Sequence, residues 1–152
     1  MDPKEERAEL FAIYAGLDAE IAAIGPRCEA SGRCCRFAEY GHTLFLSALE
    51  AEALFEPGIP PGARLSAETC PYQVGGLCTA RERRPLGCRS YFCDPTFAEA
   101  MPAISERWTQ RLKELHERSG RAWDYRPLHR HFPPGNDTCE IAAGTLRIAG
   151  ST

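Results

Sequence analysis

Cysteine placement constrains what this chain can fold into more than any other feature of its sequence. Seven of the eight cysteines fall in two clusters between residues 28 and 93. The clusters read CEASGRCC and CPYQVGGLCTARERRPLGCRSYFC, and their cysteines are Cys28, Cys34, Cys35, Cys70, Cys78, Cys88 and Cys93. Both segments carry Gly and Arg, and the second also carries Pro, rather than long apolar runs. Thiolates at short intervals in such segments are the ligands that a soft metal ion or an iron–sulfur cluster needs.

The first cluster limits its own binding mode. Cys34 and Cys35 are adjacent, so their side chains leave the backbone in different directions and rarely bind one ion together. Either one of them is a ligand while the other packs, or the two serve different metal atoms. Gly32 gives this loop the backbone freedom to fold tightly around a ligand.

Chain length predicts a single domain, residues 1–152, with a modest hydrophobic core that a bound metal could help to stabilise. Within it we expect a cysteine-cluster core at about 28–93 and helical flanks at 3–24 and 95–119. The net charge of −3 argues against a nucleic-acid partner, because phosphate neutralisation needs a basic surface.

Cysteine usage also depends on the compartment. The first residues, MDPKEERAELF, are charged and lack the apolar stretch of a secretory signal, and no apolar run is long enough to span a bilayer. The sequence therefore predicts a cytoplasmic protein with no membrane partner. In a reducing compartment, clustered cysteines are better explained by metal than by disulfides, although disulfides and unrelated buried or redox thiols are the alternatives.

Periodicity predicts helices near both ends. Apolar residues recur at three- and four-residue steps over residues 3–24, with Asp2 as N-cap and Gly25-Pro26 as the stop. This helix either packs over the core or offers a seam to a partner chain. Asp94-Pro95 should open a short helix through about Ala100, which Met101-Pro102 breaks or kinks before a longer helix resumes near Ala103 and ends at Ser119-Gly120.

Between and after these helices the sequence predicts short elements. A strand is expected at His42–Leu46, and Ser47 with Glu50 forms a capping box for a helix from Ala48 to about Glu56. A turn at residues 74–77 should place Cys70 and Cys78 close together on flanking strands. A C-terminal strand pair is expected at 139–142 and 145–148. The fold class that follows is a small α+β domain, with peripheral helices around a loop-dominated, metal-organised centre.

For several other residues the sequence allows two interpretations each. The arginines at 81–84 and Arg89 either form a solvated face or offset the negative charge of a thiolate site and donate N–H groups to sulfur. His129 and His131 could face one side of an extended segment and bind a metal, but exposed or packed side chains are the simpler reading. The same holds for His42, and Cys139 is either an extra ligand or an ordinary buried thiol.

The ordered set of cysteines resembles the bacterial cysteine-cluster family called YkgJ-like, described as a zinc- or iron-chelating domain. The family pattern has a C-x2-C-x2-C-C cluster, a Cys-Pro pair, a lone Cys after Gly, and an Arg-Pro-x-x-Cys-Arg motif closed by a final Cys. In this chain those positions are Cys28, Cys34, Cys35, Cys70-Pro71, Cys78, Arg84-Pro85, Cys88-Arg89 and Cys93. The resemblance covers about residues 28–93 and implies zinc or iron chelation by these thiolates.

One position departs from that pattern, because Ser31 stands where the family has its second cysteine. Serine is a poor ligand for zinc or iron, so either the site has one thiolate fewer, or Cys139 or a histidine replaces it. The family also resembles longer flagellin lysine methylases. This chain has no glycine-rich cofactor loop of the G-x-G-x-x-G type, which argues against methyl transfer by this chain alone.

Three functions are consistent with these observations. The first is a cytoplasmic protein that holds zinc or an iron–sulfur cluster for a structural, metal-handling or electron-transfer role. The second is a metal- or iron–sulfur-dependent enzyme with an open coordination position near Ser31, although no nucleophile–base set accompanies it. The third is a protein-interaction module folded around a structural metal, which predicts a closed site and an exposed apolar patch.

Overall fold

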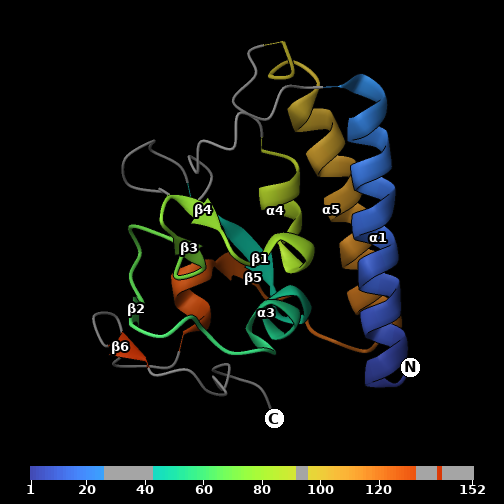
Figure 1. Cartoon of the computed structure of the whole chain (residues 1–152). Helices are drawn as coiled ribbons and strands as arrows, with labels where there is room; N and C mark the ends of the chain where they lie inside the picture. The colour runs from blue at the N-terminus through green and yellow to red at the C-terminus, as the bar shows by residue number, and fades with distance from the viewer. Residues whose placement is uncertain (26–42, 92–95, 133–139, 142–152) are drawn as a thin grey trace.

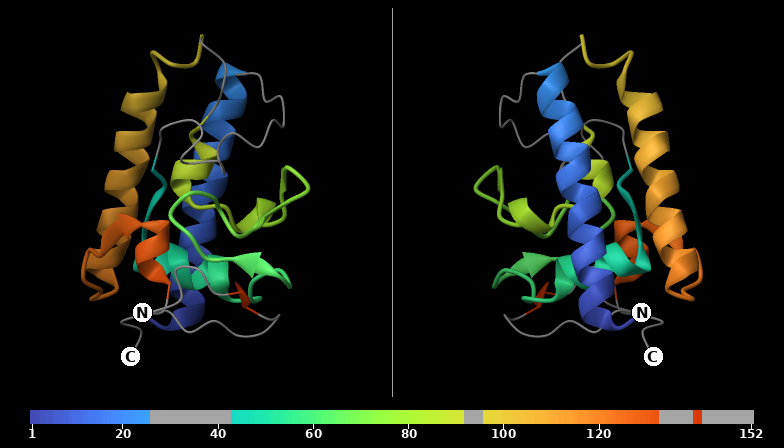
Figure 2. Two further views of the ribbon diagram at one scale, coloured as in Figure 1. Left: turned by 90° about the vertical axis from the view of Figure 1, so that its left-hand side faces the viewer. Right: turned by 90° about the vertical axis from the view of Figure 1, so that its right-hand side faces the viewer.

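Two long helices pack side by side along one side of the molecule (Figures 1 and 2). In this computed structural model, residues 1–25, 43–91, 96–132 and 140–141 are described. Helix α1 spans Pro3–Ile24 and helix α5 spans Met101–Arg118. Ion pairs join the start of one helix to the end of the other, with Glu9 to Arg118 and Glu20 to Arg107 each at 2.6 Å, so α1 and α5 run antiparallel.

Local chemistry defines both ends of α1, and its predicted bounds are confirmed. The Asp2 side chain accepts the Glu5 amide and the Glu5 side chain accepts the Asp2 amide, which completes a capping box. At the other end Gly25 adopts φ +73° and its N–H returns to the Ile21 carbonyl. A side chain would be strained at that φ, so glycine suits the helix end.

The interface of α1 and α5 forms one of two buried clusters. Its apolar stripe on α1 packs against the stripe on α5 that the sequence predicts to be core. The two stripes consist of Leu10, Tyr14, Leu17 and Ile21 on α1 and of Ile104, Trp108, Leu112 and Leu115 on α5. Trp108 lies so close to α1 that a Cβ at Gly16 would be 2.5 Å from its Cη2 atom. The missing side chain of Gly16 thus lets the indole ring lie across α1.

A short two-stranded sheet and two further helices occupy the middle of the molecule (Figure 1). Strand β1 (Phe45–Ser47) pairs antiparallel with β5 (Tyr125–Pro127), so that Ser47 faces Tyr125. Helix α3 (Ala48–Phe55) follows β1 directly and begins at the predicted capping box. Helix α4 has a single turn, Leu86–Arg89. The strand predicted at His42–Leu46 corresponds to β1, which begins at Phe45. His42 lies outside the described residues.

The remaining strands and short helices lie on the side of the molecule away from α1 and α5 (Figure 1). Strands β3 (Gln73–Val74) and β4 (Leu77–Cys78) form the predicted hairpin, whose turn residues Gly75 and Gly76 have φ +60° and +81°. Such positive values at both central positions favour glycine. The short 3-10 helices are η2 (Arg81–Arg83) and η3 (Leu128–His131). Together these elements form a small α+β fold.

Two sequence predictions about this fold are wrong in detail. Residues 96–100 form turns rather than a helix, and Pro102 lies in the first turn of α5 rather than interrupting a helix. Proline is compatible with the first turn because the amide it lacks has no helical partner there. Near the C-terminus, strand β6 (Glu140–Ile141) pairs with β2 (Ala63–Arg64), a partner that the sequence did not suggest. The expected second strand at 145–148 lies outside the described residues.

None of the helices within the described ranges is long and apolar enough to cross a membrane.

Replacement of Gly16 by valine should destabilise the protein by about 2 kcal/mol, because the new side chain displaces a buried indole ring. Trp108 cannot simply swing away, since its Nε1 donates to Glu20 and its ring is 7% exposed. Urea unfolding followed by circular dichroism measures the change. Valine at the exposed Ala15 on the same helix is the matched control, and equal losses in the two variants would contradict this packing account.

Candidate metal centre

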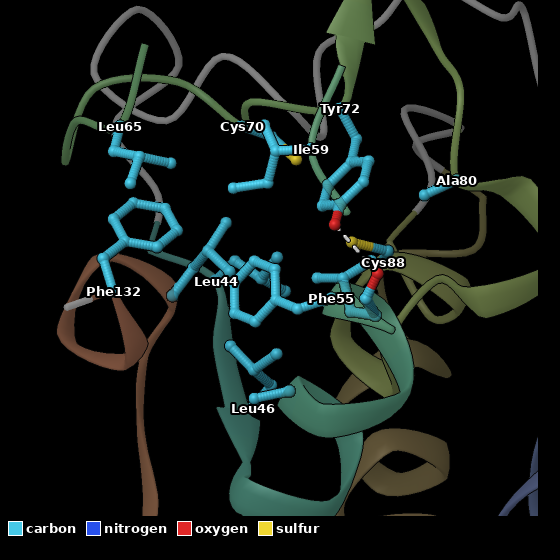
Figure 3. Close-up of a cluster of buried hydrophobic side chains, with 13 residues drawn as sticks. Leu44, Leu46, Phe55, Ile59, Leu65, Cys70, Tyr72, Ala80, Cys88 and Phe132 are labelled. Carbon is cyan, nitrogen blue, oxygen red and sulfur yellow. Dashed lines mark hydrogen bonds between the residues drawn. The ribbon is translucent and has the colours of Figure 1, made fainter. Parts of the chain in front are cut away.

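Three of the predicted ligands lie in or against the second buried cluster: Cys70 and Cys88 belong to it, as Figure 3 shows, and Cys78 packs against it. We call this cluster the cysteine core; it comprises Leu44, Leu46, Ala51, Leu54, Phe55, Ile59, Leu65, Cys70, Tyr72, Ala80, Cys88, Leu128 and Phe132. Cys70 and Cys88 are each 7% exposed, and Cys78 packs against the core from its edge. No disulfide joins these three cysteines to one another. They arrive from a turn, from the end of β4 and from α4.

The hairpin brings the first two thiols to this core in a different way from the one predicted. Cys78 ends β4 and pairs with Gln73 of β3. Cys70 lies before β3 rather than on it, and its carbonyl oxygen accepts the Gln73 N–H at 3.1 Å. The prediction that both cysteines occupy flanking strands is therefore wrong for Cys70. A turn places it there because Pro71, the next residue, has no N–H to contribute to a strand ladder.

Tyr72 ties the cysteine segment to helix α3. Its hydroxyl lies 2.9 Å from the Leu54 carbonyl oxygen and 2.8 Å from that of Gly58, and its ring stacks on Phe55. Burial, with a smaller contribution from Cys70, raises the pKa of Tyr72 well above its ordinary value. The phenol therefore stays protonated and keeps its hydrogen bonds, which hold the Cys70 side of the hairpin against α3.

The Arg84-Pro85-x-x-Cys88-Arg89 motif forms a closed loop that presents Cys88. Pro85 is the N-cap residue of α4, and Arg89 folds back over the loop that precedes the helix. The guanidinium of Arg89 donates to the Arg84 carbonyl at 2.7 Å, to the Glu82 carbonyl, and to the Asp18 carboxylate of α1 at 2.7 Å. These three N–H groups donate to oxygen, and the buried position of the side chain shows that Arg89 is not part of a solvated face.

Helix α1 receives this loop on an aromatic surface. The Arg89 guanidinium carbon lies 4.2 Å from the centre of the Tyr14 ring, and the Arg89 side chain is only 6% exposed. A guanidinium over an aromatic face gains electrostatic attraction in addition to its hydrogen bonds. Cys88, the neighbour of Arg89 in the chain, therefore takes its position from α1.

Glu50 completes the support beneath Cys88. Its carboxylate accepts the Leu86 N–H at 2.7 Å, the Tyr14 hydroxyl at 3.0 Å and the Ser47 N–H at 3.0 Å. The residue is fully buried, and burial raises the pKa of Glu50 although these donors oppose the shift. One side chain of α3 thereby caps α4, anchors α1 and closes its own capping box.

Replacement of Arg89 by methionine should lower the free energy of unfolding by about 2–4 kcal/mol, because buried carbonyl groups lose their donor. Chemical denaturation of the purified variants provides the measurement. Arg107→Met is the matched control, since Arg107 is 53% exposed and pairs with Glu20 at the surface. A similar, small effect of both changes would show that Arg89 does not brace the loop.

The histidines near the C-terminus do not form the pair that the sequence allowed. Residues 128–131 adopt a 3-10 helix rather than an extended segment, so His129 and His131 point to different sides. His131 is fully buried, and its Nε2 lies 2.8 Å from the Leu46 carbonyl oxygen. A carbonyl only accepts, so Nε2 carries the proton. His131 therefore supports β1, and His129 is half-buried.

Acid should destabilise the protein through His131. Burial lowers the pKa of His131, so below about pH 6.5 the unfolded chain takes up a proton before the folded one does. Stability is then lost as the pH falls through that window, by at most about 1.4 kcal/mol per pH unit for one group. His131→Gln keeps a donor for Leu46 but cannot titrate. Between pH 7 and pH 5, denaturation experiments should therefore show that the wild type loses more stability than His131→Gln. Equal losses in the two proteins would contradict the assignment of this pH dependence to His131.

Among the described residues, no three histidine, cysteine or acidic side chains form a group that could hold a metal ion. Cys70, Cys78 and Cys88 thus share a core without making a three-ligand site by themselves. The other predicted positions lie outside the described residues, and they are Cys28, Ser31, Cys34, Cys35, Cys93 and Cys139. A complete site at this core therefore needs ligands from those segments.

Sequence reasoning missed Tyr14 and Glu50 as supports of the cysteine loop. Glu50 carried one signal, its place in a capping box, but that motif alone predicts a helix start at the surface. Tyr14 belonged to an apolar stripe and showed no polar role. The hydrogen bonds of the Tyr14 hydroxyl and the Glu50 carboxylate form only when α1, α3 and α4 pack together, so the sequence alone does not reveal them.

Comparison with known proteins found no relative of this chain. No protein-family model, no curated protein and no solved structure matches this chain. The resemblance to the YkgJ-like family accordingly depends on the spacing of the cysteines.

Proposed function

We propose that this protein binds zinc or an iron–sulfur cluster through clustered cysteine thiolates. The proposed ligands are Cys28, Cys34, Cys35, Cys70, Cys78, Cys88 and Cys93. The observation that carries the proposal is that Cys70, Cys78 and Cys88, from three separate parts of the chain, lie in or against one core with no disulfide between them. Soft thiolates in this number suit zinc and iron–sulfur clusters better than magnesium or calcium.

The structure around these thiols fits a metal-supported fold. Strands β3 and β4 contain two residues each, and isolated two-stranded hairpins are marginally stable in water. A metal bound across this segment would supply free energy that such short strands cannot. Reach also favours a shared site, because Cys93 follows Tyr91 by two residues, at most about 7 Å of chain. Tyr91 and Cys88 line the same pocket.

The two kinds of metal site differ in how many of the cysteines they would use. A four-iron cluster needs four cysteines and leaves three or four for a second site or for packing, whereas two zinc sites use nearly all eight. The role would be structural, metal handling or electron transfer. We place the protein in the cytoplasm on the basis of its sequence.

Two alternatives each have an observation in their favour. A metal-dependent enzyme with an open coordination position is favoured by the pocket that reaches Cys88 from the surface. An interaction module is favoured by Val74 and Leu77, which flank the hairpin turn and are each 53% exposed. Tight metal retention without turnover would separate a binding or structural role from catalysis.

Anaerobic purification followed by visible absorption and elemental analysis tests the proposal. Iron, acid-labile sulfide and a broad band at about 400 nm are expected for a thiolate-held cluster, and stoichiometric zinc in a colourless protein for zinc sites. Cys70→Ser and Cys88→Ser should each lower the metal content, because each removes one thiolate from the core.

Ala80→Ser is the matched control, since Ala80 is 2% exposed in the same core and the change introduces a hydroxyl without removing a thiol. The control should retain its metal. A folded wild-type protein without zinc, iron or sulfide would refute the proposal and return these cysteines to packing or redox roles.

A further inference from the structure

A pocket of about 370 Å³ is lined in part by Cys88 and Leu44, which also belong to the cysteine core. Four parts of the chain that are distant in sequence form its walls, namely residues 43–45, 87–91, 101–105 and Tyr125. Its size falls within the range of small-molecule sites in proteins. Cys88 therefore belongs both to the buried core and to a cavity that solvent can enter.

One wall of this pocket is a preformed aromatic surface. Phe45 lines the pocket and is 41% exposed, so its ring is accessible to a ligand. Its ring stacks on Tyr125 with centroids 5.7 Å apart, and Tyr125 stacks on Trp123 at 5.1 Å and 10°. His116 then meets Trp123 edge to face at 5.1 Å. The stack holds the exposed Phe45 ring in place before any ligand arrives.

The rest of the lining offers apolar contacts and hydroxyl groups. Leu44, Met101 and Pro102 provide apolar surface, and hydroxyls come from Thr43, Ser90, Tyr91 and Ser105. Gly87 also lines the pocket, and its side of the pocket is closely packed. A larger residue would not fit at this position, because a Cβ there would lie 2.8 Å from Leu44 Cδ1. Apart from Cys88, a proposed thiolate ligand, the described lining residues are uncharged, and burial raises the pKa of Tyr125 to about 12, so its phenol is neutral.

We propose that this pocket binds a small uncharged molecule with an aromatic ring and at least one hydrogen-bonding group. The ring would lie against Phe45 and Tyr125, where offset aromatic contacts are favourable, and its polar group would meet the hydroxyls. An ionised ligand would lose hydration without a charged partner in the described lining. The proposal goes beyond metal binding and does not depend on it, because Phe45, Tyr125 and the hydroxyl-bearing residues of the described lining are not proposed metal ligands.

Titration with N-phenyl-1-naphthylamine, an uncharged fluorescent aromatic amine, tests this proposal on the full chain. Its emission should rise and shift to the blue on binding, and an anionic naphthalene sulfonate should bind more weakly. Phe45→Ala removes one wall and should weaken binding about three- to tenfold. Ser105→Phe should fill the cavity and abolish binding.

Matched controls are Leu77→Ala, which truncates another exposed apolar residue, and Gln110→Phe, which adds a ring to an exposed position of α5. Both should bind the probe as the wild type does. The proposal is overturned if the wild type gives no emission change, if the anionic probe binds more tightly, or if Phe45→Ala and its control behave alike. Metal content of the same samples reports separately on the proposed metal site, and should be unchanged in Phe45→Ala.

Discussion

The carboxylate of Glu50 is fully buried, and donors from α1, α4 and the residue before α3 converge on it. Burying a carboxylate is costly unless hydrogen bonds replace its water, so these three donors must be present together. The consequence is a fixed meeting point of α1, α3 and α4. The Cys70 segment is connected to α3 by the hydrogen bond from the Tyr72 hydroxyl to the Leu54 carbonyl, and α4, which presents Cys88, is connected to Glu50 by the Leu86 N–H.

Arg89 extends this arrangement to the surface of α1. Its bonds to Arg84, Glu82 and Asp18 and its position over the Tyr14 ring hold the cysteine loop against a helix far away in sequence. The Arg-Pro-x-x-Cys-Arg motif is thus explained by loop geometry: Pro85 begins α4, Cys88 points into the core and Arg89 locks the turn.

Cys88 connects the two proposals without making one depend on the other. It belongs to a core that also contains Cys70 and receives Cys78, and it lines the aromatic pocket as well. If it holds a metal, its thiolate would lie beside any molecule bound in the pocket. The two sites would then be coupled through one side chain, as a metal-dependent enzyme requires and a purely structural metal does not.

The sequence alone determined the features that depend on neighbouring residues. Asp2, Glu5 and Gly25 set the ends of α1, Ser47 and Glu50 set the start of α3, and Gly75-Gly76 set the hairpin turn, because caps and turns are satisfied within a few residues. Clustered cysteines likewise pointed to metal chemistry by composition and spacing, and four of those seven positions lie outside the described residues.

Only the tertiary structure decided the rest. The pairing of β2 with β6, the helical start at Met101-Pro102 and the 3-10 turn that separates His129 from His131 all depend on contacts between distant segments. The same is true of Glu50, which local sequence presents as a surface cap and the assembled helices bury. Strands of two or three residues carry too little periodicity to predict their partners, and a buried polar group reveals its role only when all of its donors are in place.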